Sequence, residues 1–327
     1  MKFLITGGAG YIGSITNSVL QKAGHETVIY DRVACRKSKV GVQTESIVGD
    51  LRDLSAIQKV FKTHTFDAVI HFAASALAGE SMLRPHEYFE NNILGGLNLL
   101  EAMKDSACKN FIFSSTCAVY GYPTKTPVTE DETIKPVSVY GASKRMFEEI
   151  LAWYETLYGI KIGILRYFNA SGAALDGSLG ELHVPETHII PIALDVALGK
   201  QKEFSLYGND YETKDGTCVR DYIHVLDLAD AHILAASHLR SGGASFTVNL
   251  GVGRGYSNLE ILSMIEKVTL KNIPYKILPR RAGDPAKIFA DNTKAKEFLG
   301  WTPKYSDLET IISSAWKWHS FLRKEGS

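Results

Sequence analysis

The sequence predicts an α/β fold built on a doubly wound parallel sheet, followed by a smaller mixed α/β unit. Short apolar runs alternate with helical patterns over the first 170 residues, which is typical of strands joined by crossover helices. These runs are apolar almost without interruption, as expected of strands that are covered on both faces. A glycine-rich turn lies between the first run and the first helical pattern.

Five apolar runs are expected to be the strands of this sheet. β-Branched residues within them favour strands over buried helices. The helical patterns between them include one that extends to about Gly24 and one over Asn91–Lys104, where the apolar residues lean to one side. The expected strands are Phe3–Thr6, Thr27–Tyr30, Ala68–Phe72, Asn110–Ser114 and Ile160–Tyr167.

The composition changes after Asn169. Residues 170–186 carry Gly, Ser, Pro and His without a clear period, which indicates a loop. Smaller elements are expected beyond it. They are helices near Ile189–Gly199, Val225–Leu239 and Leu259–Val268, strands near Glu203–Tyr207, Phe246–Leu250 and Pro274–Leu278, and an amphipathic helix after Asp307.

Two domains follow from this organisation. Residues 1–170 form the first domain, and residues 171–327 form most of the second. A segment near residues 225–250, which includes the strand Phe246–Leu250, is expected to return to the first domain.

The charges of the 327-residue chain balance, with 36 Lys and Arg against 36 Asp and Glu. Such a surface lacks the basic excess of a non-specific nucleic-acid binder, so no nucleic-acid partner is expected. Hydrophobic residues make up 45% of the chain, which excludes a disordered protein. No apolar run reaches the roughly 18 residues of a membrane helix, so no membrane partner is expected.

The cysteines and the N-terminus indicate a cytoplasmic protein. The first apolar stretch stops at Thr6, which favours a strand over a signal peptide. Four cysteines are scattered without a C-x-x-C pair, which favours unpaired thiols in a reducing compartment. They are Cys35, Cys108, Cys117 and Cys218.

The glycine-rich turn predicts a dinucleotide site. Gly7, Gly10 and Gly13 have the spacing G-x-x-G-x-x-G between a strand and a helix. Glycines let the backbone approach a pyrophosphate, which then lies at the helix N-terminus. The motif alone is also compatible with a plain strand-to-helix turn. Asp31 at the end of the second strand favours NAD, because a carboxylate there can bind ribose hydroxyls, although the adjacent Arg32 is compatible with NADP.

A tyrosine and a lysine indicate acid–base chemistry. Tyr140 and Lys144 lie four positions apart at the start of a helical stretch, and therefore on one helix face. A nearby cation and the positive charge of an oxidised nicotinamide would favour the phenolate and lower the pKa of the phenol, which makes it a usable base. Thr116 follows a predicted strand and could hydrogen-bond the same substrate oxygen. Taken alone, the pair is also compatible with an ordinary surface tyrosine and lysine, and Thr116 with a capping hydroxyl.

Several motifs in this order resemble the extended short-chain dehydrogenase/reductase family, and within it the UDP-glucose 4-epimerases. The resemblance covers essentially the whole chain. It rests on T-G-G-A-G-Y-I-G-S from Thr6, G-D-L-R-D (Gly49–Asp53), V-I-H-F-A-A (Val69–Ala74), G-E-S (Gly79–Ser81), F-S-S-T-C-A-V-Y-G (Phe113–Gly121), Y-G-A-S-K (Tyr140–Lys144), L-R-Y-F-N (Leu165–Asn169), Y-G-N-D-Y (Tyr207–Tyr211), R-D-Y-I-H-V-L-D-L-A (Arg220–Ala229) and P-R-R-A-G-D-P-A (Pro279–Ala286).

The resemblance implies NAD as cofactor, a UDP-sugar as substrate, and a role for each matching residue. The implied catalytic residues are Thr116, Tyr140 and Lys144. The implied NAD site consists of Gly7, Gly10, Tyr11, Ile12, Gly13, Asp31, Asp50, Leu51, Phe72, Ala73, Ala74, Asn91, Ser114, Tyr140, Lys144 and Tyr167. The implied UDP-sugar site consists of Thr116, Tyr140, Asn169, His188, Ser205, Tyr207, Arg220, Arg281 and Asp284.

The implied reaction interconverts UDP-glucose and UDP-galactose through a transient 4-keto sugar, which rotates and is reduced again. The alternative that the substrate is another UDP-sugar, such as an N-acetylhexosamine, a pentose or a uronate, stays open. Ile288 occupies the position that, in the family, helps to determine the space for a 2-acetamido group, and isoleucine is of intermediate bulk. A dehydratase of the superfamily would place an acid just after Thr116, where Cys117 and Ala118 stand. A non-catalytic nucleotide-binding protein would lack Tyr140 or Lys144.

The resemblance also implies a homodimer. Residues 91–104 and 143–158 would pair with their copies in a four-helix interface. Their apolar faces fit that arrangement and fit internal packing equally well.

Overall fold

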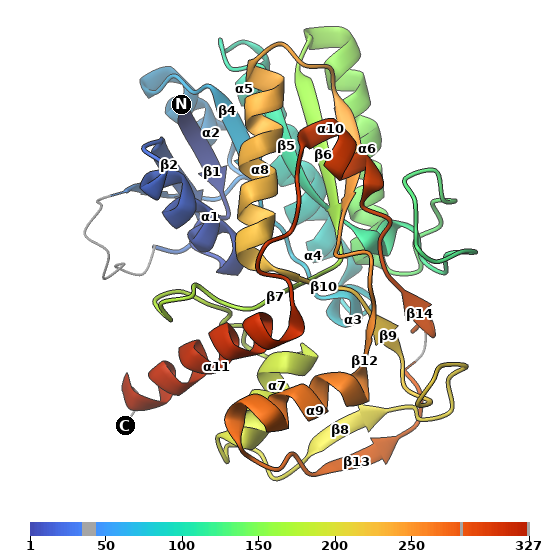
Figure 1. Ribbon diagram of the computed structural model, residues 1–327. Coiled ribbons are helices and arrows are strands. Elements are labelled where there is room, and N and C mark those ends of the chain that lie inside the picture. Colours follow the sequence, from blue (N-terminus) through green and yellow to red (C-terminus); the bar gives the residue numbers. More distant parts are fainter. Residues whose placement is uncertain (35–43, 282–283, 326–327) are drawn as a thin grey trace.

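The structure is a computed structural model that describes residues 1–34, 44–281 and 284–325. Its centre is a parallel sheet of seven strands in the order β11-β6-β5-β4-β1-β2-β3, all from the described residues (Figure 1). The order turns away from β1 in both directions, as in a doubly wound sheet. The strands are β1 (Lys2–Thr6), β2 (Glu26–Asp31), β3 (Glu45–Val48), β4 (Ala68–His71), β5 (Asn110–Thr116), β6 (Lys161–Tyr167) and β11 (Phe246–Leu250).

Helices cover both faces of this sheet, and each face has its own core. Successive strand residues point to opposite sides, so Phe3 and Ile5 enter one core whereas Leu4 enters the other. One face is covered by α1 (Tyr11–Lys22), α8 (Val225–Arg240) and α10 (Thr293–Leu299), and the other by α2 (Leu54–Thr63), α5 (Gly95–Lys104) and α6 (Val139–Tyr158).

A smaller unit lies below the carboxyl ends of the main strands (Figure 1). It has a core of its own, to which its three helices contribute. A parallel strand pair, β8 (Phe204–Tyr207) and β13 (Tyr275–Leu278), lies along its outer side. The three helices are α7 (Ile189–Ala197), α9 (Asn258–Thr269) and α11 (Leu308–Glu325).

Short elements connect the two parts. In a three-stranded sheet, β9 lies between β12 and β14, and in a separate pair β7 lies beside β10. These strands are β7 (Asn169–Ser171), β9 (Val219–Arg220), β10 (Tyr222–His224), β12 (Tyr256–Ser257) and β14 (Lys287–Ile288). The remaining short helices are α3 (Ala78–Ser81), α4 (Pro85–Phe89), η1 (Glu90–Leu94) and η2 (Cys117–Val119).

The predicted fold class is confirmed, with two local differences. The helix expected over Asn91–Lys104 begins as the π-helical turn η1 and becomes α-helical only from Gly95. Strand β3 was not expected, because only Ile47 of its four residues is even partly buried and the segment shows no apolar run. It forms as an edge strand through backbone pairing with β2.

The sequence also predicts unpaired thiols and no membrane helix. Cys108, Cys117 and Cys218 are free thiols, whereas Cys35 lies outside the described residues. Within the described residues, no helix has both the length and the apolarity that crossing a membrane requires.

Candidate active site

The glycine turn between β1 and α1 has the shape of an anion cradle. Gly7 has a φ of +73°, and a Cβ there would lie 2.5 Å from the backbone nitrogen of Ala73. A Cβ on Gly13 would overlap the carbonyl oxygen of Gly7. Gly10 caps α1 without a side-chain hydrogen bond, so the first amides of the helix stay open to a ligand. Tyr11 and Ile12 begin this helix. The turn therefore fits the pyrophosphate of a dinucleotide.

Asp31 lies at the end of β2, beside this turn. Its carboxylate accepts hydrogen bonds from the amide of Ala9 at 3.0 Å and from that of Val33 at 3.2 Å. Both bonds hold the carboxylate in place while it keeps further acceptor positions for ribose hydroxyls. Arg32 next to it is exposed.

Five more of the predicted cofactor residues follow the ends of β3 and β4, whereas Asn91 lies in η1, Ser114 in β5 and Tyr167 at the end of β6. The amides of Phe72 and Ala73 both donate to the carbonyl oxygen of Thr6, which joins the ends of β4 and β1. Asn91 donates to the hydroxyl of Ser75 at 3.0 Å, one residue after Ala74. In the turn after β3, the carbonyl of Asp50 accepts from the Tyr30 hydroxyl and that of Leu51 accepts from Asn98.

The predicted catalytic residues come from one strand and one helix. Thr116 ends β5, and Tyr140 and Lys144 occupy the first two turns of α6. The hydroxyl of Ser81 accepts the backbone N–H of Tyr140 at 3.1 Å, which holds the helix start against α3. Lys144 donates to the carbonyl of Ser114 at 2.8 Å.

Burial sets the electrostatics of this pair. It lowers the pKa of Lys144 to about 7, although the negative charge of Glu148 acts in the opposite direction. It also raises the pKa of Tyr140, and the Thr116 hydroxyl offsets this only in part. In the protein without its cofactor, desolvation of the phenolate therefore sets the direction of the Tyr140 pKa.

The contacts of His232 with two predicted cofactor residues were not predicted from the sequence. Its Nε2 hydrogen-bonds Ser114 Oγ at 3.0 Å, and its ring lies 4.6 Å from that of Phe72. Burial lowers the pKa of His232 to about 4, so the imidazole is neutral. Burial also raises the pKa of the neighbouring Tyr167 to about 12. His232 lies in α8 shortly after the motif that ends at Ala229, and nothing in that motif pointed to its contact with Ser114.

A second missed feature supports α6 from behind. Glu148 and Arg166 form a buried ion pair of 2.7 Å between α6 and β6. The Ser115 hydroxyl donates to the same carboxylate at 2.6 Å, and the Tyr120 hydroxyl accepts from Arg166 at 3.0 Å. This network fixes the catalytic helix against the strands beneath it.

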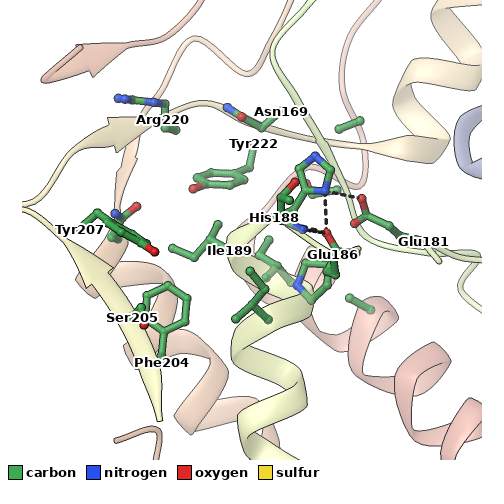
Figure 2. A pocket seen from close by; sticks show the side chains of 18 of the residues that line it. Asn169, Glu181, Glu186, His188, Ile189, Phe204, Ser205, Tyr207, Arg220 and Tyr222 are labelled. Carbon is green, nitrogen blue, oxygen red and sulfur yellow. Dashed lines mark hydrogen bonds and ion pairs between the residues drawn. The ribbon is translucent and has the colours of Figure 1, made fainter. Parts of the chain in front are cut away.

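A cavity of about 600 Å³ lies between the two parts of the molecule. Arg220 on β9 pairs with Asp284, and Arg281 lies 4.0 Å from the ring centroid of Tyr207. Figure 2 shows Tyr207 and Ser205 on one side of the cavity, opposite His188. Seven of the predicted substrate residues line it: Asn169, His188, Ser205, Tyr207, Arg220, Arg281 and Asp284.

Thr116 and Tyr140 are the two predicted substrate residues that do not line this cavity. The motif around Arg281 is described in part, since residues 282–283 lie outside the described residues. Ile288 is buried among apolar side chains such as Phe168 and Val128, and it is not part of the cavity wall either.

Comparison with known proteins agrees with this geometry. Residues 4–314 match the family model described as GDP-mannose 4,6 dehydratase. A UDP-glucose 4-epimerase from Lactobacillus helveticus is 47% identical over 98% of this chain and 97% of its own length. The chain belongs to the UDP-glucose 4-epimerase family. Solved structures of this family share the whole fold with it.

Two such structures carry bound molecules. The UDP-glucose 4-epimerase from Brucella ovis, in complex with NAD, is 45% identical, with a TM-score of 0.92 over 96% of each chain. The enzyme from Bifidobacterium longum, in complex with NAD+ and UDP, is 38% identical, with a TM-score of 0.91 over 98% of each chain. This similarity covers both the seven-stranded sheet and the smaller unit.

Proposed function

We propose that the chain is an NAD-dependent epimerase that interconverts UDP-glucose and UDP-galactose. The observation that carries the proposal is the placement of Thr116 at the carboxyl end of β5 and of Tyr140 and Lys144 at the start of α6, together with a cavity that Arg220 and Arg281 supply with positive charge. A nucleotide cradle, a phenol and a cationic pocket are what a redox epimerisation of a UDP-sugar requires.

The first 170 residues and the segment near 225–250 would hold NAD, with the remainder holding the UDP-sugar. NAD would lie along the residues implied for it, from the glycine turn through Asp31 to Ser114 and Tyr167. When bound, it supplies the hydride acceptor and donor for carbon 4 of the sugar. The open amides at the start of α1 would face its pyrophosphate.

Tyr140 would take the proton of the sugar 4-hydroxyl and return it to the same oxygen. Thr116 would hydrogen-bond that oxygen and orient it. Lys144, held by Ser114, would stabilise the phenolate. The positive nicotinamide of bound NAD would add to this stabilisation and would oppose the burial that raises the pKa of Tyr140.

The UDP end of the substrate would be held in the cavity. The planar guanidinium groups of Arg220 and Arg281 suit diphosphate oxygens, and Tyr207 and Ser205 would lie near the uracil. Anchoring the nucleotide leaves the hexose free to turn, so that both faces of carbon 4 can be presented in sequence.

The dehydratase alternative is less well supported. A 4,6-dehydration needs a proton-transferring acid beside Thr116, and the next side chain is the Cys117 thiol. Burial raises the pKa of Cys117 to about 12, which makes the thiol a poor proton donor and a poor base at neutral pH.

Incubation with separate UDP-sugars tests the proposed function. The purified protein should convert UDP-glucose into UDP-galactose and the reverse, without added NAD in each turnover. UDP-N-acetylhexosamines, UDP-pentoses and UDP-uronates, assayed in parallel, define the substrate range. Absence of UDP-glucose and UDP-galactose interconversion would refute the proposal.

The proposal also includes that the protein is a cytoplasmic homodimer. Large apolar side chains on α6, such as Met146, Trp153 and Leu157, are between 44% and 66% exposed, which suits pairing of this helix with its copy. The free thiols Cys108 and Cys218 suit a reducing compartment. Light scattering after size exclusion should give twice the chain mass, and a monomer would contradict the dimer.

A further inference from the structure

Four side chains beside the cavity form a compact group of metal-ligand type. Glu181, His183, Glu186 and His188 follow one another with the spacing E-x-H-x-x-E-x-H. Each offers one ligand atom, and these atoms all lie within 4.8 Å of one another. Figure 2 shows the His188 imidazole between the carboxylates of Glu181 and Glu186.

Three distances within the group are hydrogen-bond lengths, somewhat shorter than the ligand separations around a tetrahedral ion. His188 Nδ1 lies 2.9 Å from Glu181 Oε1 and 2.8 Å from Glu186 Oε1, and His183 Nδ1 lies 2.9 Å from Glu181 Oε1. Zinc bonds of about 2.0–2.1 Å separate tetrahedral ligands by about 3.4 Å. These three separations would widen by about half an ångström around an ion, and the other separations, which are at most 4.8 Å, would adjust to the same value.

Two of the ligands are already held in place. The carbonyl of Glu181 accepts the indole N–H of Trp318 at 2.8 Å, which fixes this residue to α11. Glu186 Oε1 accepts the amides of Thr187 at 2.7 Å and His188 at 2.8 Å, just before α7. Such support orients ligands and lowers the entropic cost of binding an ion.

A divalent ion would also match the two carboxylates of the group. The carboxylate of Glu181 is almost fully buried, at 8% exposure. In the part of the chain that the structure describes, Glu181 and Glu186 form ion pairs with His183 and His188, and no lysine or arginine joins them. A divalent ion would neutralise both carboxylates and leave both imidazoles uncharged.

We propose that Glu181, His183, Glu186 and His188 bind a structural zinc ion. Two imidazole nitrogens and two carboxylate oxygens make a closed four-coordinate set that suits zinc better than magnesium or calcium, which prefer oxygen ligands alone. The ion would cross-link residues 181–188 before α7, a loop that the Trp318 hydrogen bond already joins to α11. Ligation through Nδ1 leaves Nε2–H of His188 as a donor for a ligand in the cavity.

The test uses untagged full-length protein and zinc alone. The protein is dialysed against EDTA, exchanged into chelator-free buffer and titrated with zinc chloride against a competing indicator, and bound metal is then measured by mass spectrometry. We expect one zinc per chain. X-ray absorption at the zinc edge should give two imidazole nitrogens and two oxygens at about 2.0–2.2 Å.

Single substitutions locate the ion. His183→Ala and Glu181→Gln should each weaken zinc binding at least about 10-fold, a loss that even outer-shell changes produce. His86→Ala is the matched control, because His86 contacts Glu90 in an exposed pair at 3.4 Å, and it should keep full zinc binding. Circular dichroism in EDTA verifies that each variant is folded.

Three results would each overturn the proposal. The first is a wild-type chain that retains less than about a tenth of a zinc at equilibrium with micromolar zinc. The second is unchanged zinc binding in both ligand variants, and the third is an absorption spectrum without imidazole ligands. These measurements do not depend on epimerase turnover, so the zinc site and the proposed reaction are tested independently of each other.

Discussion

Lys144 Nζ donates a 2.8 Å hydrogen bond to the carbonyl oxygen of Ser114, which joins α6 to β5. The ammonium also lies 4.7 Å from the ring centroid of Phe113. Strand β5 ends two residues later at Thr116, so one contact relates the phenol-bearing helix to the hydroxyl-bearing strand end. Lys144 therefore has two properties that substitution can separate, its charge and its anchoring of the helix.

The charge of Lys144 makes stability depend on pH. Burial lowers the pKa of Lys144 in the folded chain from its ordinary value of 10.5 to about 7. Between these values the unfolded state binds more protons, so the free energy of unfolding rises with pH through this window. Relative to Lys144→Met, the wild type should gain on the order of a few kcal/mol between pH 7 and 10. Urea unfolding of both proteins in the same cofactor state measures this, and parallel pH profiles would contradict it.

Tyr140→Phe removes the proposed acid–base group with little change in shape. Turnover of UDP-glucose should fall by about 10²–10⁴-fold, the usual contribution of general acid–base catalysis. UDP affinity, measured by calorimetry, should stay within about twofold, because the cavity residues that would hold UDP are untouched. Tyr158→Phe, near the other end of the same helix, is the control and should retain turnover. Wild-type rates in Tyr140→Phe would remove this residue from the mechanism.

Arg281 and Arg280 offer a matched pair of substitutions. Arg281 lies over Tyr207 in the cavity, whereas Arg280 pairs with Asp210 in an exposed ion pair of 2.7 Å. Arg281→Ala should weaken UDP binding by about 1.5–3 kcal/mol, the scale of a charge-assisted hydrogen bond. Arg280→Ala should change it by less than about 0.5 kcal/mol. Equal losses in both variants, measured by calorimetry, would place Arg281 outside the UDP site.

Gly13→Ala should impair NAD retention. A Cβ at this position would overlap the carbonyl oxygen of Gly7, so the turn would have to open. We expect purified Gly13→Ala to lose most of its bound NAD, measured by absorbance after denaturation. Lys22→Ala, at the far end of α1, is the control and should retain it. Full NAD content in Gly13→Ala would show that the cofactor does not approach the turn closely.

Glu148→Gln tests the network behind α6. The substitution leaves Arg166 buried without its countercharge, which typically costs about 3–5 kcal/mol. Urea unfolding should show this loss, whereas Glu149→Gln should be nearly neutral because Glu149 pairs with Arg145 at the exposed surface. A Glu148→Gln protein as stable as the wild type would mean that the pair contributes no net stability.

Features set by local spacing were predictable from the sequence. The Gly7 and Gly13 turn and the placement of Tyr140 and Lys144 on one helix depend on a few neighbouring residues, and the structure confirms both arrangements. The apolar runs predicted six of the seven main strands. Strand β3 was not predicted, because it forms through backbone pairing with β2 and not through an apolar run.

Features that join distant segments were not predictable in the same way. His232 meets Ser114, and Arg166 meets Glu148, only once the sheet has formed. The direction of the Tyr140 pKa depends on burial, which spacing does not report. The UDP-sugar residues were inferred through family resemblance, since an isolated arginine in a sequence is usually a solvated charge.

The order of the strands along the chain bears on synthesis at the ribosome. The last strand of the main sheet, β11, ends at Leu250, whereas the cavity also needs Arg281, Asp284 and α11. A nascent chain that has been synthesised as far as Leu250 already contains every strand of the seven-stranded sheet but cannot yet close the cavity. Domains fold largely as they emerge, so the nucleotide cradle would mature before the sugar pocket exists, and NAD would have the first opportunity to bind.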